Sequence, residues 1–413
     1  MSAPGLSIPE NPLAKMRGNL VGAAIGLILL SIIIGVVVHF YKKSKSEPTN
    51  VKGTGETQTL LLEEISAELG QGIKGLSDMK EKDIKKGPTV QKGPGAPDVE
   101  TVSLINLQPI TVKQSGYIGP LSAGVFNETT FATHALKSGC RTFVFQIDYY
   151  EGSAKDAKLF PAPNEPCLLS RDDSGTLVSL NAGSILKMST AIASTAFYKS
   201  TPANTDPVII ILHGVRTPDP IVAPKDYLAY CSKIATQLGP LIPYHLGLTT
   251  TGDYHRQALE ADIFTKPFNA FEKKVIILST FDTTLFRNVS KLNIPQYTPY
   301  NDLDFLTHAR LYKEGIISNT IHTYGRIIEI DTLVGLAPDD QANWVLKNKG
   351  YFTVVLPKLM TNLPTGVVDT LINKMGINVV PLDLFSFPVA DTKLTLDIWK
   401  KKIWKLKPVA LIT

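Results

Sequence analysis

Two patterns of apolar residues recur along the chain after residue 101. Short continuous runs rich in β-branched residues predict buried strands, and segments with an apolar residue at every third or fourth position predict helices. The predicted strands are Thr142–Ile147, Val208–Leu212, Lys274–Ser279, Arg326–Ile330, Thr353–Leu356 and Ile377–Leu384. The predicted helices are Glu128–Lys137, Ser184–Phe197, Tyr227–Gln237, Asp302–Lys313, Gln341–Lys347 and Val367–Lys374.

The alternation of these elements predicts the fold class. Strands that are apolar along their whole length are typical of parallel sheets that helices cover on both faces. Strands that alternate with helices build α/β folds, and a closed sheet of this kind is a (β/α)8 TIM-type barrel of about 250 residues. We therefore expect a barrel domain over residues 101–413, with functional groups at the carboxyl ends of its strands.

The longest apolar run lies near the N-terminus. Leu20 to Val38 contains no charged residue, and a helix of this length covers about 30 Å, the thickness of the hydrocarbon core of a bilayer. The run is too long for the apolar part of a signal peptide, which has about 7–15 residues. We predict a transmembrane helix over residues 19–41 that contacts the lipid bilayer through Leu20 to Val38, after a polar segment over residues 1–18.

Residues 42–100 have the composition of a flexible tether, because Gly-Pro and Pro-Gly steps recur in them. One amphipathic helix is predicted inside the tether, over residues 59–79. Its apolar face consists of Leu61, Leu62, Ile65, Leu69, Ile73 and Leu76. This face packs either on the chain's own domain or on a partner protein, and the sequence leaves both open.

Charge and cysteine content narrow the choice of compartment and partner. Three lysines within residues 42–45 outweigh Lys15 and Arg17 before the span, which favours a cytoplasmic C-terminal domain. The sequons at Asn127 and Asn288 favour the opposite side. Three cysteines without metal-ligand spacing indicate a reducing compartment and no zinc site. The net charge of +5 is modest, so a nucleic-acid partner is not expected.

One stretch carries candidate chemistry: the segment His134–Tyr150 predicts a helix that stops at Gly139, followed by a buried strand. Its sequence resembles the X region of the phosphatidylinositol-specific phospholipases C. It reads His-Ala-Leu-Lys-Ser-Gly-Cys-Arg-Thr-Phe-Val-Phe-Gln-Ile-Asp-Tyr-Tyr. Four further blocks are similar to that family in the same order, namely Asp206–Gly214, Lys233–Leu241, Phe268–Ser279 and Gly376–Ser386. The resemblance implies a barrel of the phospholipase C-like phosphodiesterase kind.

The resemblance also implies two catalytic histidines and a calcium site, and the sequence departs from both. The turn that holds the first histidine falls within residues 114–122, which contain none, and serine and arginine stand where the second His-Gly pair is expected. One family carboxylate is a glutamine here, a second is retained, and a third is a histidine. The family-site positions are Gln146, Asp148, Ser170, Arg171 and His213, and of these only Asp148 keeps the residue of the family.

These departures favour a protein without catalysis. Each general acid or base contributes about 10²–10⁴ in rate, and calcium prefers several carboxylate oxygens. The sequence therefore predicts no catalytic residue, no metal site and no cofactor.

Our leading hypothesis is a single-pass, membrane-anchored and inactive phospholipase C-like scaffold or adaptor that binds other structural proteins. By analogy with virion proteins of large DNA viruses, we expect a minor capsid protein that links an internal membrane to a protein shell. The alternatives are an active phosphodiesterase or phospholipase, with a site rebuilt from His213, Asp148, Arg171 and His245, and a module that binds a phospholipid headgroup.

Other polar groups have mainly structural interpretations. His213 and Arg216 follow the same strand, where they either bind an anion or form a structural polar pair. Asp339 and Asp340 are expected to cap the next helix and to match its dipole. The segment Trp399–Lys407 is either a membrane-surface segment, a strand or a docking tail.

Overall fold

The computed structural model describes residues 90–91, 102–121, 123–152, 159–246, 263–286, 302–313, 325–333, 336–356, 363–385, 395–399 and 402–412. The chain divides into two compact units, Met1–Thr57 and Gln58–Thr413, and all described residues belong to the second. The predicted N-terminal segment, transmembrane helix and amphipathic helix lie outside the described residues. Among the residues that are described, no helix has both the length and the apolar character needed to cross a bilayer.

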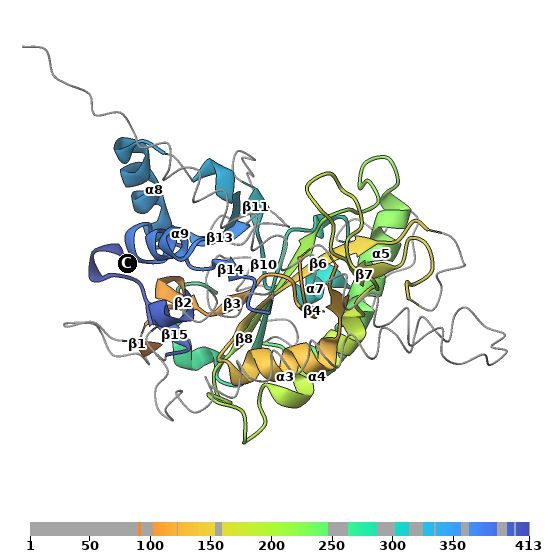
Figure 1. Cartoon of the computed structure of the whole chain (residues 1–413), viewed down its shortest axis with the longest axis horizontal. Helices are drawn as coiled ribbons and strands as arrows, with labels where there is room; N and C mark the ends of the chain where they lie inside the picture. Colours follow the sequence, from red (N-terminus) through yellow and green to blue (C-terminus); the bar gives the residue numbers. More distant parts are fainter. Residues whose placement is uncertain are drawn as a thin grey trace, which may run out of the picture. The chain divides into compact units, whose positions relative to one another are not determined.

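Strands and helices alternate through the second unit, which is an α/β fold (Figure 1). The strands are β1 (Val90–Gln91), β2 (Leu107–Pro109), β3 (Thr111–Val112), β4 (Tyr117–Ile118), β5 (Val125–Phe126), β6 (Thr142–Tyr149), β7 (Pro166–Leu168), β8 (Val208–Gly214), β9 (Val275–Ser279), β10 (Ala309–Arg310), β11 (Tyr312–Lys313), β12 (Gly325–Glu329), β13 (Phe352–Leu356), β14 (Pro381–Leu382) and β15 (Trp404–Leu406). The α-helices are α3 (Glu128–Lys137), α4 (Ile185–Thr195), α5 (Pro224–Gln237), α7 (Leu303–Leu306), α8 (Pro338–Gly350) and α9 (Thr365–Asp369), and a π-helix follows at Thr370–Lys374.

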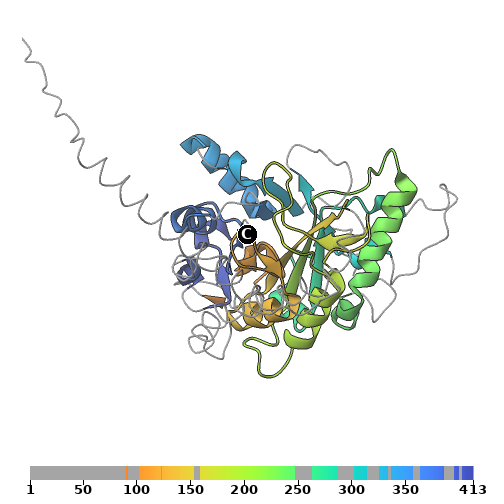
Figure 2. The same cartoon turned by 45° about the vertical axis from the view of Figure 1, so that its right-hand side comes forward.

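Parallel pairing builds the central sheet, in the order β10-β9-β8-β6-β3-β14, and β7 adds to β6 in the antiparallel direction. The register places Gln146 of β6 opposite His213 of β8. A second sheet, β11-β12-β13, is also parallel. Figures 1 and 2 both show α3 and α4 side by side along one face of the central strands.

The strand pairing does not form one uninterrupted ring. Leu311 alone separates β10, which pairs with β9, from β11, which pairs with β12. On the other side a single parallel bridge joins Val354 of β13 to Val379, just before β14. The structure thus establishes a largely parallel α/β fold, and a closed (β/α)8 barrel stays an expectation.

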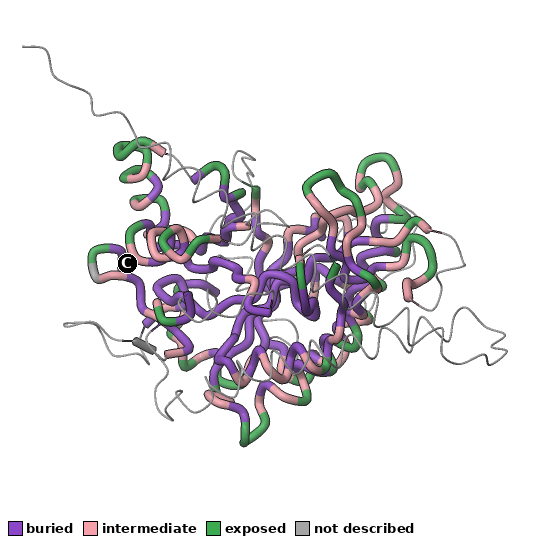
Figure 3. Tube along the Cα trace, viewed as in Figure 1, coloured by how far each residue is buried: buried purple, intermediate pink, exposed green. Residues whose placement is uncertain are grey.

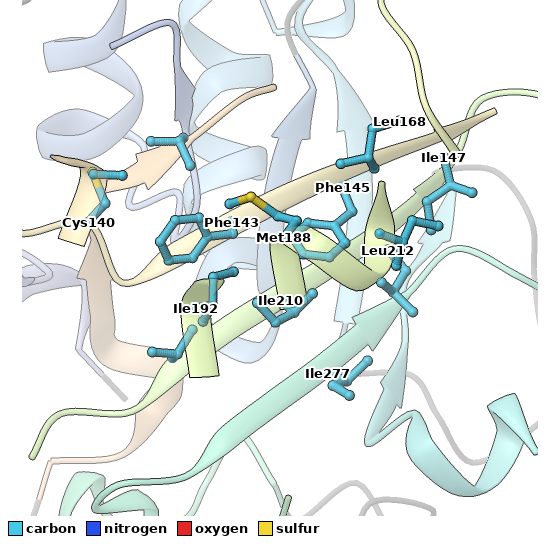
Figure 4. Packing of buried hydrophobic residues seen from close by; sticks show 14 of the residues in the cluster. Cys140, Phe143, Phe145, Ile147, Leu168, Met188, Ile192, Ile210, Leu212 and Ile277 are labelled. Atoms are coloured by element: carbon cyan, nitrogen blue, oxygen red, sulfur yellow. The ribbon is translucent and has the colours of Figure 1, made fainter. Parts of the chain in front are cut away.

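The two faces of β6 pack into different apolar clusters, because successive side chains of a strand point to opposite sides. Phe143, Phe145 and Ile147 belong to the cluster that includes α3 and α4, and Figure 4 shows two of these rings beside Met188 and Ile192 of α4. The other face contributes Val144 to a second cluster. That cluster includes Ile209, Ile211, Ile276, Leu278, Ala309, Leu311, Ile327, Phe352 and Val354. The central strands are therefore buried on both faces, as the tube in Figure 3 also shows.

The predicted helix over Asp302–Lys313 is wrong. Only Leu303–Leu306 is helical, and the chain then becomes β10 and β11. The His308 amide donates to Ile277 O (2.8 Å), and the His308 Nδ1 atom accepts from the Ile277 amide (2.9 Å). Pairing with the open edge of β9 thus outweighs the local helical spacing.

The predicted strand over Ile377–Leu384 is largely wrong as well, since only Pro381–Leu382 forms a strand. The side chain of Asn378 takes over backbone pairing at its start. Its Oδ1 atom accepts from the Thr353 amide (3.0 Å), and its Nδ2 atom donates to Ile105 O (2.6 Å). A buried amide of this kind replaces ladder hydrogen bonds.

The segment Trp399–Lys407, which the sequence left open, contains strand β15. It lies between β1, in the parallel direction, and β2, in the antiparallel direction. Val90 and Gln91, which fall inside the predicted tether, are thus paired with the C-terminal strand. Strand β2 of this small sheet leads directly into β3, so the small sheet lies at the amino end of the central strands.

The double-sided burial of β6 generates a stability prediction. Phe145 is fully buried, so Phe145→Ala is expected to lower the free energy of unfolding by about 3–5 kcal/mol, through lost burial and a cavity. Leu186 of α4 is 47% exposed, and Leu186→Ala should change the free energy of unfolding by less than about 0.5 kcal/mol. Urea unfolding of the two variants measures both values. Equal losses would contradict the packing described here.

Candidate functional site

The five family-site positions meet at the carboxyl ends of neighbouring strands. Gln146 and Asp148 lie in the last half of β6, and His213 lies at the end of β8. Ser170 and Arg171 follow β7, whose antiparallel pairing with β6 places Cys167 opposite Asp148. Sequence positions far apart are thus brought to one edge of the sheet.

The carboxylate of Asp148 is held between two guanidinium groups. Arg171 Nε donates to Oδ2 (2.7 Å), and Arg216 Nε donates to Oδ1 (2.7 Å). The amide of Tyr149 also donates to Oδ1 (2.6 Å). The Asp148 side chain is only 1% exposed, so its negative charge needs this compensation to remain buried.

The two arginines have further partners that fix their positions. Arg171 donates from its terminal nitrogens to Gly175 O (2.9 Å) and to Tyr149 O (3.4 Å). Arg216 forms an ion pair with Glu151 (3.0 Å), and its guanidinium lies 4.4 Å from the centroid of the Tyr149 ring. We refer to Arg171, Asp148 and Arg216 as the arginine clamp.

Ser170, at the second expected histidine position, binds a residue of the turn in which the first histidine is expected. Gln114 follows β3, and its Nε2 atom donates to Ser170 Oγ (3.1 Å). Both side chains are buried. Neither an amide nor a hydroxyl exchanges protons near pH 7. A proton shuttle between these positions therefore has no chemical basis in the side chains present.

His213 and Gln146 lie opposite each other on the neighbouring strands β8 and β6. Among the described residues, His213 Nδ1 and Gln146 Oε1 are buried and accept or donate no hydrogen bond. Burial, with a smaller contribution from Lys313, lowers the pKa of His213 to about 4. The imidazole is therefore neutral at pH 7. Since its pKa in the unfolded chain is higher, protonation favours unfolding as the pH falls from 6.5 towards 4.

Sequence reasoning missed a buried ion pair at the same edge. Lys113 follows β3 and Asp383 follows β14, and the register of these strands brings the two together, with Nζ 3.1 Å from Oδ2. Burial lowers the pKa of the Lys113 amine and raises that of the Asp383 carboxyl, while their mutual attraction opposes both shifts. A lysine and an aspartate that each follow a short strand were the available signal, but the strands themselves were too short to predict.

Other sequence candidates lie elsewhere or act differently. His245 is buried, and its ring stacks on His308 with centroids 4.1 Å apart, so it does not join the edge described above. Arg216 pairs with Asp148 rather than with His213. Asp339 and Asp340 lie in the first turn of α8, where they match its dipole. The predicted cap is wrong, since Ala337 is the N-cap residue and Pro338 begins the helix.

The residues of this edge do not fit the calcium ion that the resemblance implies. Both carboxylate oxygens of Asp148 are occupied by arginine donors. Gln146 and His213, at the other two ligand positions, bring no negative charge. A calcium ion takes six to eight oxygen ligands and favours carboxylates. Two guanidinium groups at this place would repel it.

Comparison with known proteins identifies the fold. No family model and no curated sequence matches the chain. Crystal structures of PLC21 from L. pealei and S. officinalis match it with a TM-score of 0.51, at 14% and 15% identity, over 77% of this chain and 38% of theirs. A calcium-dependent phosphoinositol-specific phospholipase C from Pseudomonas sp. matches with a TM-score of 0.39 and 10% identity, over 76% of this chain and all of its own.

The chain therefore has an α/β fold like that of the phospholipase C structures. It spans less than half of the length of the PLC21 proteins. At identities this low, the similarity concerns the fold alone.

The arginine clamp generates a prediction for Asp148→Asn. Removal of the buried carboxylate leaves two guanidinium groups facing a neutral amide, so we expect a loss of about 3 kcal/mol in the free energy of unfolding. The matched control is Glu151→Gln, which removes a 61% exposed carboxylate from the same Arg216 and should change stability little. Urea unfolding at pH 7 compares them. An Asp148→Asn variant as stable as the control would contradict the clamp.

Proposed function

We propose that this protein is a membrane-anchored, catalytically inactive scaffold with a phospholipase C-like domain. The observation that carries the proposal is the arginine clamp, because the one retained family carboxylate is neutralised by protein groups. A carboxylate with both oxygens bound by arginines is a poor ligand for a metal ion.

The loss of the two expected imidazoles adds support. Ser170 stands at the second expected histidine position and binds Gln114, the turn over residues 114–122 contains no histidine, and His213 has a pKa of about 4 and faces a glutamine. Phosphodiester cleavage needs both a base and an acid at such a site, each contributing about 10²–10⁴ in rate. The domain would then keep the fold but would not catalyse phosphodiester cleavage.

The scaffold role itself rests on the sequence. The apolar run Leu20–Val38 would anchor the chain in a bilayer, and the following tether would let the domain reach other structural proteins. By analogy, such a protein would be a minor capsid component between an internal membrane and a protein shell, with its domain on the cytoplasmic side. The two parallel arcs, linked at Leu311 and at Val379, would close into an eight-stranded barrel.

One observation favours a second candidate, a module that binds a phospholipid headgroup. The buried atoms His213 Nδ1 and Gln146 Oε1 lie on paired residues at the carboxyl edge and have no partner among the described residues. Buried polar atoms normally have a hydrogen-bond partner. The hydroxyl groups of a headgroup would supply both a donor and an acceptor there.

A turnover assay tests the inactive state. The full chain in detergent, mixed with phosphatidylinositol vesicles, should release no inositol phosphate, and calcium should leave its melting temperature unchanged. Product that disappears in His213→Ala would instead establish a rebuilt enzyme. Vesicle binding without product, lost in the same variant, would establish the headgroup module. Lys233→Ala, at an exposed ion pair, is the matched control.

Cross-linking with mass spectrometry on native membranes tests the scaffold role. Cross-links from the domain to other structural proteins, on one side of the bilayer only, are expected. Cross-links confined to the chain itself would contradict an adaptor, and cross-links or glycans on the luminal side would reverse the predicted orientation.

A further inference from the structure

The C-terminal residues 402–412 form a strap across the amino end of the central strands. Its strand β15 is the only described partner of β1, and it also pairs with β2. Ile403 and Trp404 are fully buried, so the strap is part of the second apolar cluster. The paired position of Val90 and Gln91 therefore depends on β15 staying in place.

The strap carries a buried lysine at its end. Lys407 is 2% exposed, and its Nζ atom donates to Asn348 O (2.8 Å), in the last turn of α8. Its backbone amide donates to Asn106 O (2.9 Å). The side chain thus joins the strap to the C-terminal end of helix α8.

The charged neighbour that acts on this amine, Arg326, is basic. Arg326 of β12 lies against the same asparagine, with a guanidinium nitrogen 2.5 Å from Asn348 Oδ1. Lys347 and Lys349 lie in the last turn of α8, and Lys405 lies on β15 itself. The acidic residues of α8, Asp339 and Asp340, are at its opposite end. Within the described ranges no carboxylate pairs with Lys407.

A second buried donor weakens the strap. The indole Nε1 of Trp404 has no hydrogen-bond partner among the described residues. An unsatisfied buried donor costs about 1–3 kcal/mol relative to the solvated group. The strap therefore closes over two polar groups that water would satisfy better, and opening recovers their hydration.

We propose that the strap is a pH-sensitive latch, in which the Lys407 amine, buried beside Arg326 without a carboxylate, favours opening when it is protonated. Opening releases β15 and with it β1, and so frees the chain segment that precedes β2. This inference does not depend on the proposed scaffold role, because it concerns a part of the fold remote from the carboxyl edge.

The direction of the pH effect follows from linkage. Burial, with a smaller effect of Arg326, lowers the pKa of Lys407 from 10.5 to about 7. Between these values the open strap binds a proton that the closed strap does not, so closure becomes less favourable as the pH falls. The opening constant should rise about tenfold for each pH unit from pH 10 to 7 and level off below.

Hydrogen exchange of the full chain in detergent micelles tests the latch. Protection factors, which correct for the intrinsic pH dependence of exchange, are measured from pH 9 to pH 6 for β1, β15 and α3. As the pH falls from 9 to 7, the protection factors of the β1 and β15 amides should fall together by about tenfold per pH unit. The protection factors of the α3 amides should stay constant.

Two variants separate the latch from general destabilisation. Lys407→Met keeps the length of the side chain without its charge and should make strap protection independent of pH. Lys405→Met, on the same strand but half-buried, should keep the pH dependence. The proposal is overturned if Lys407→Met retains the dependence, if the wild-type strap shows none, or if α3 loses protection with the strap.

Discussion

The burial of β6 on both faces is the constraint from which the rest of the structure follows. A strand with helices on one side and neighbouring strands' apolar side chains on the other has no contact with water along most of its length. Asp148, near its end, must therefore find compensation within the protein. Arg171 lies just after β7 and Arg216 lies in the loop after β8. Two of the three strands that pair with β6 therefore lead to the two counter-charges.

The carboxyl edge is thus electrostatically closed. The aspartate is matched by arginines, Lys113 is matched by Asp383, and Gln114 is matched by Ser170. Polar networks of this kind stabilise a fold when every member is satisfied. Among the described residues, His213, Gln146 and the Ser115 hydroxyl are exceptions. The pairing of His213 with Gln146 is why a bound headgroup is the alternative with the best physical support.

The two ends of the central sheet differ in character. The carboxyl edge is rich in paired charges, whereas the amino end is crossed by an apolar strap that buries an amine near helix α8. β2 connects the strap directly to β3, the strand that leads to Lys113 and Gln114.

The sequence by itself determined the long strands and helices and the lack of histidines at the expected turns. Continuous apolar runs predicted the central strands β6, β8 and β9, and helical spacing predicted α3, α4 and α5, because double burial and local periodicity leave a signal in consecutive residues. The absence of histidines at the expected turns was also readable directly. Tertiary structure alone decided the helix-to-strand change at Ala309, the pairing of β15 with Val90 and the partners of Asp148. Each of these three features depends on an open strand edge or a buried charge whose partner is distant in sequence. The spacing of neighbouring residues cannot indicate such a partner.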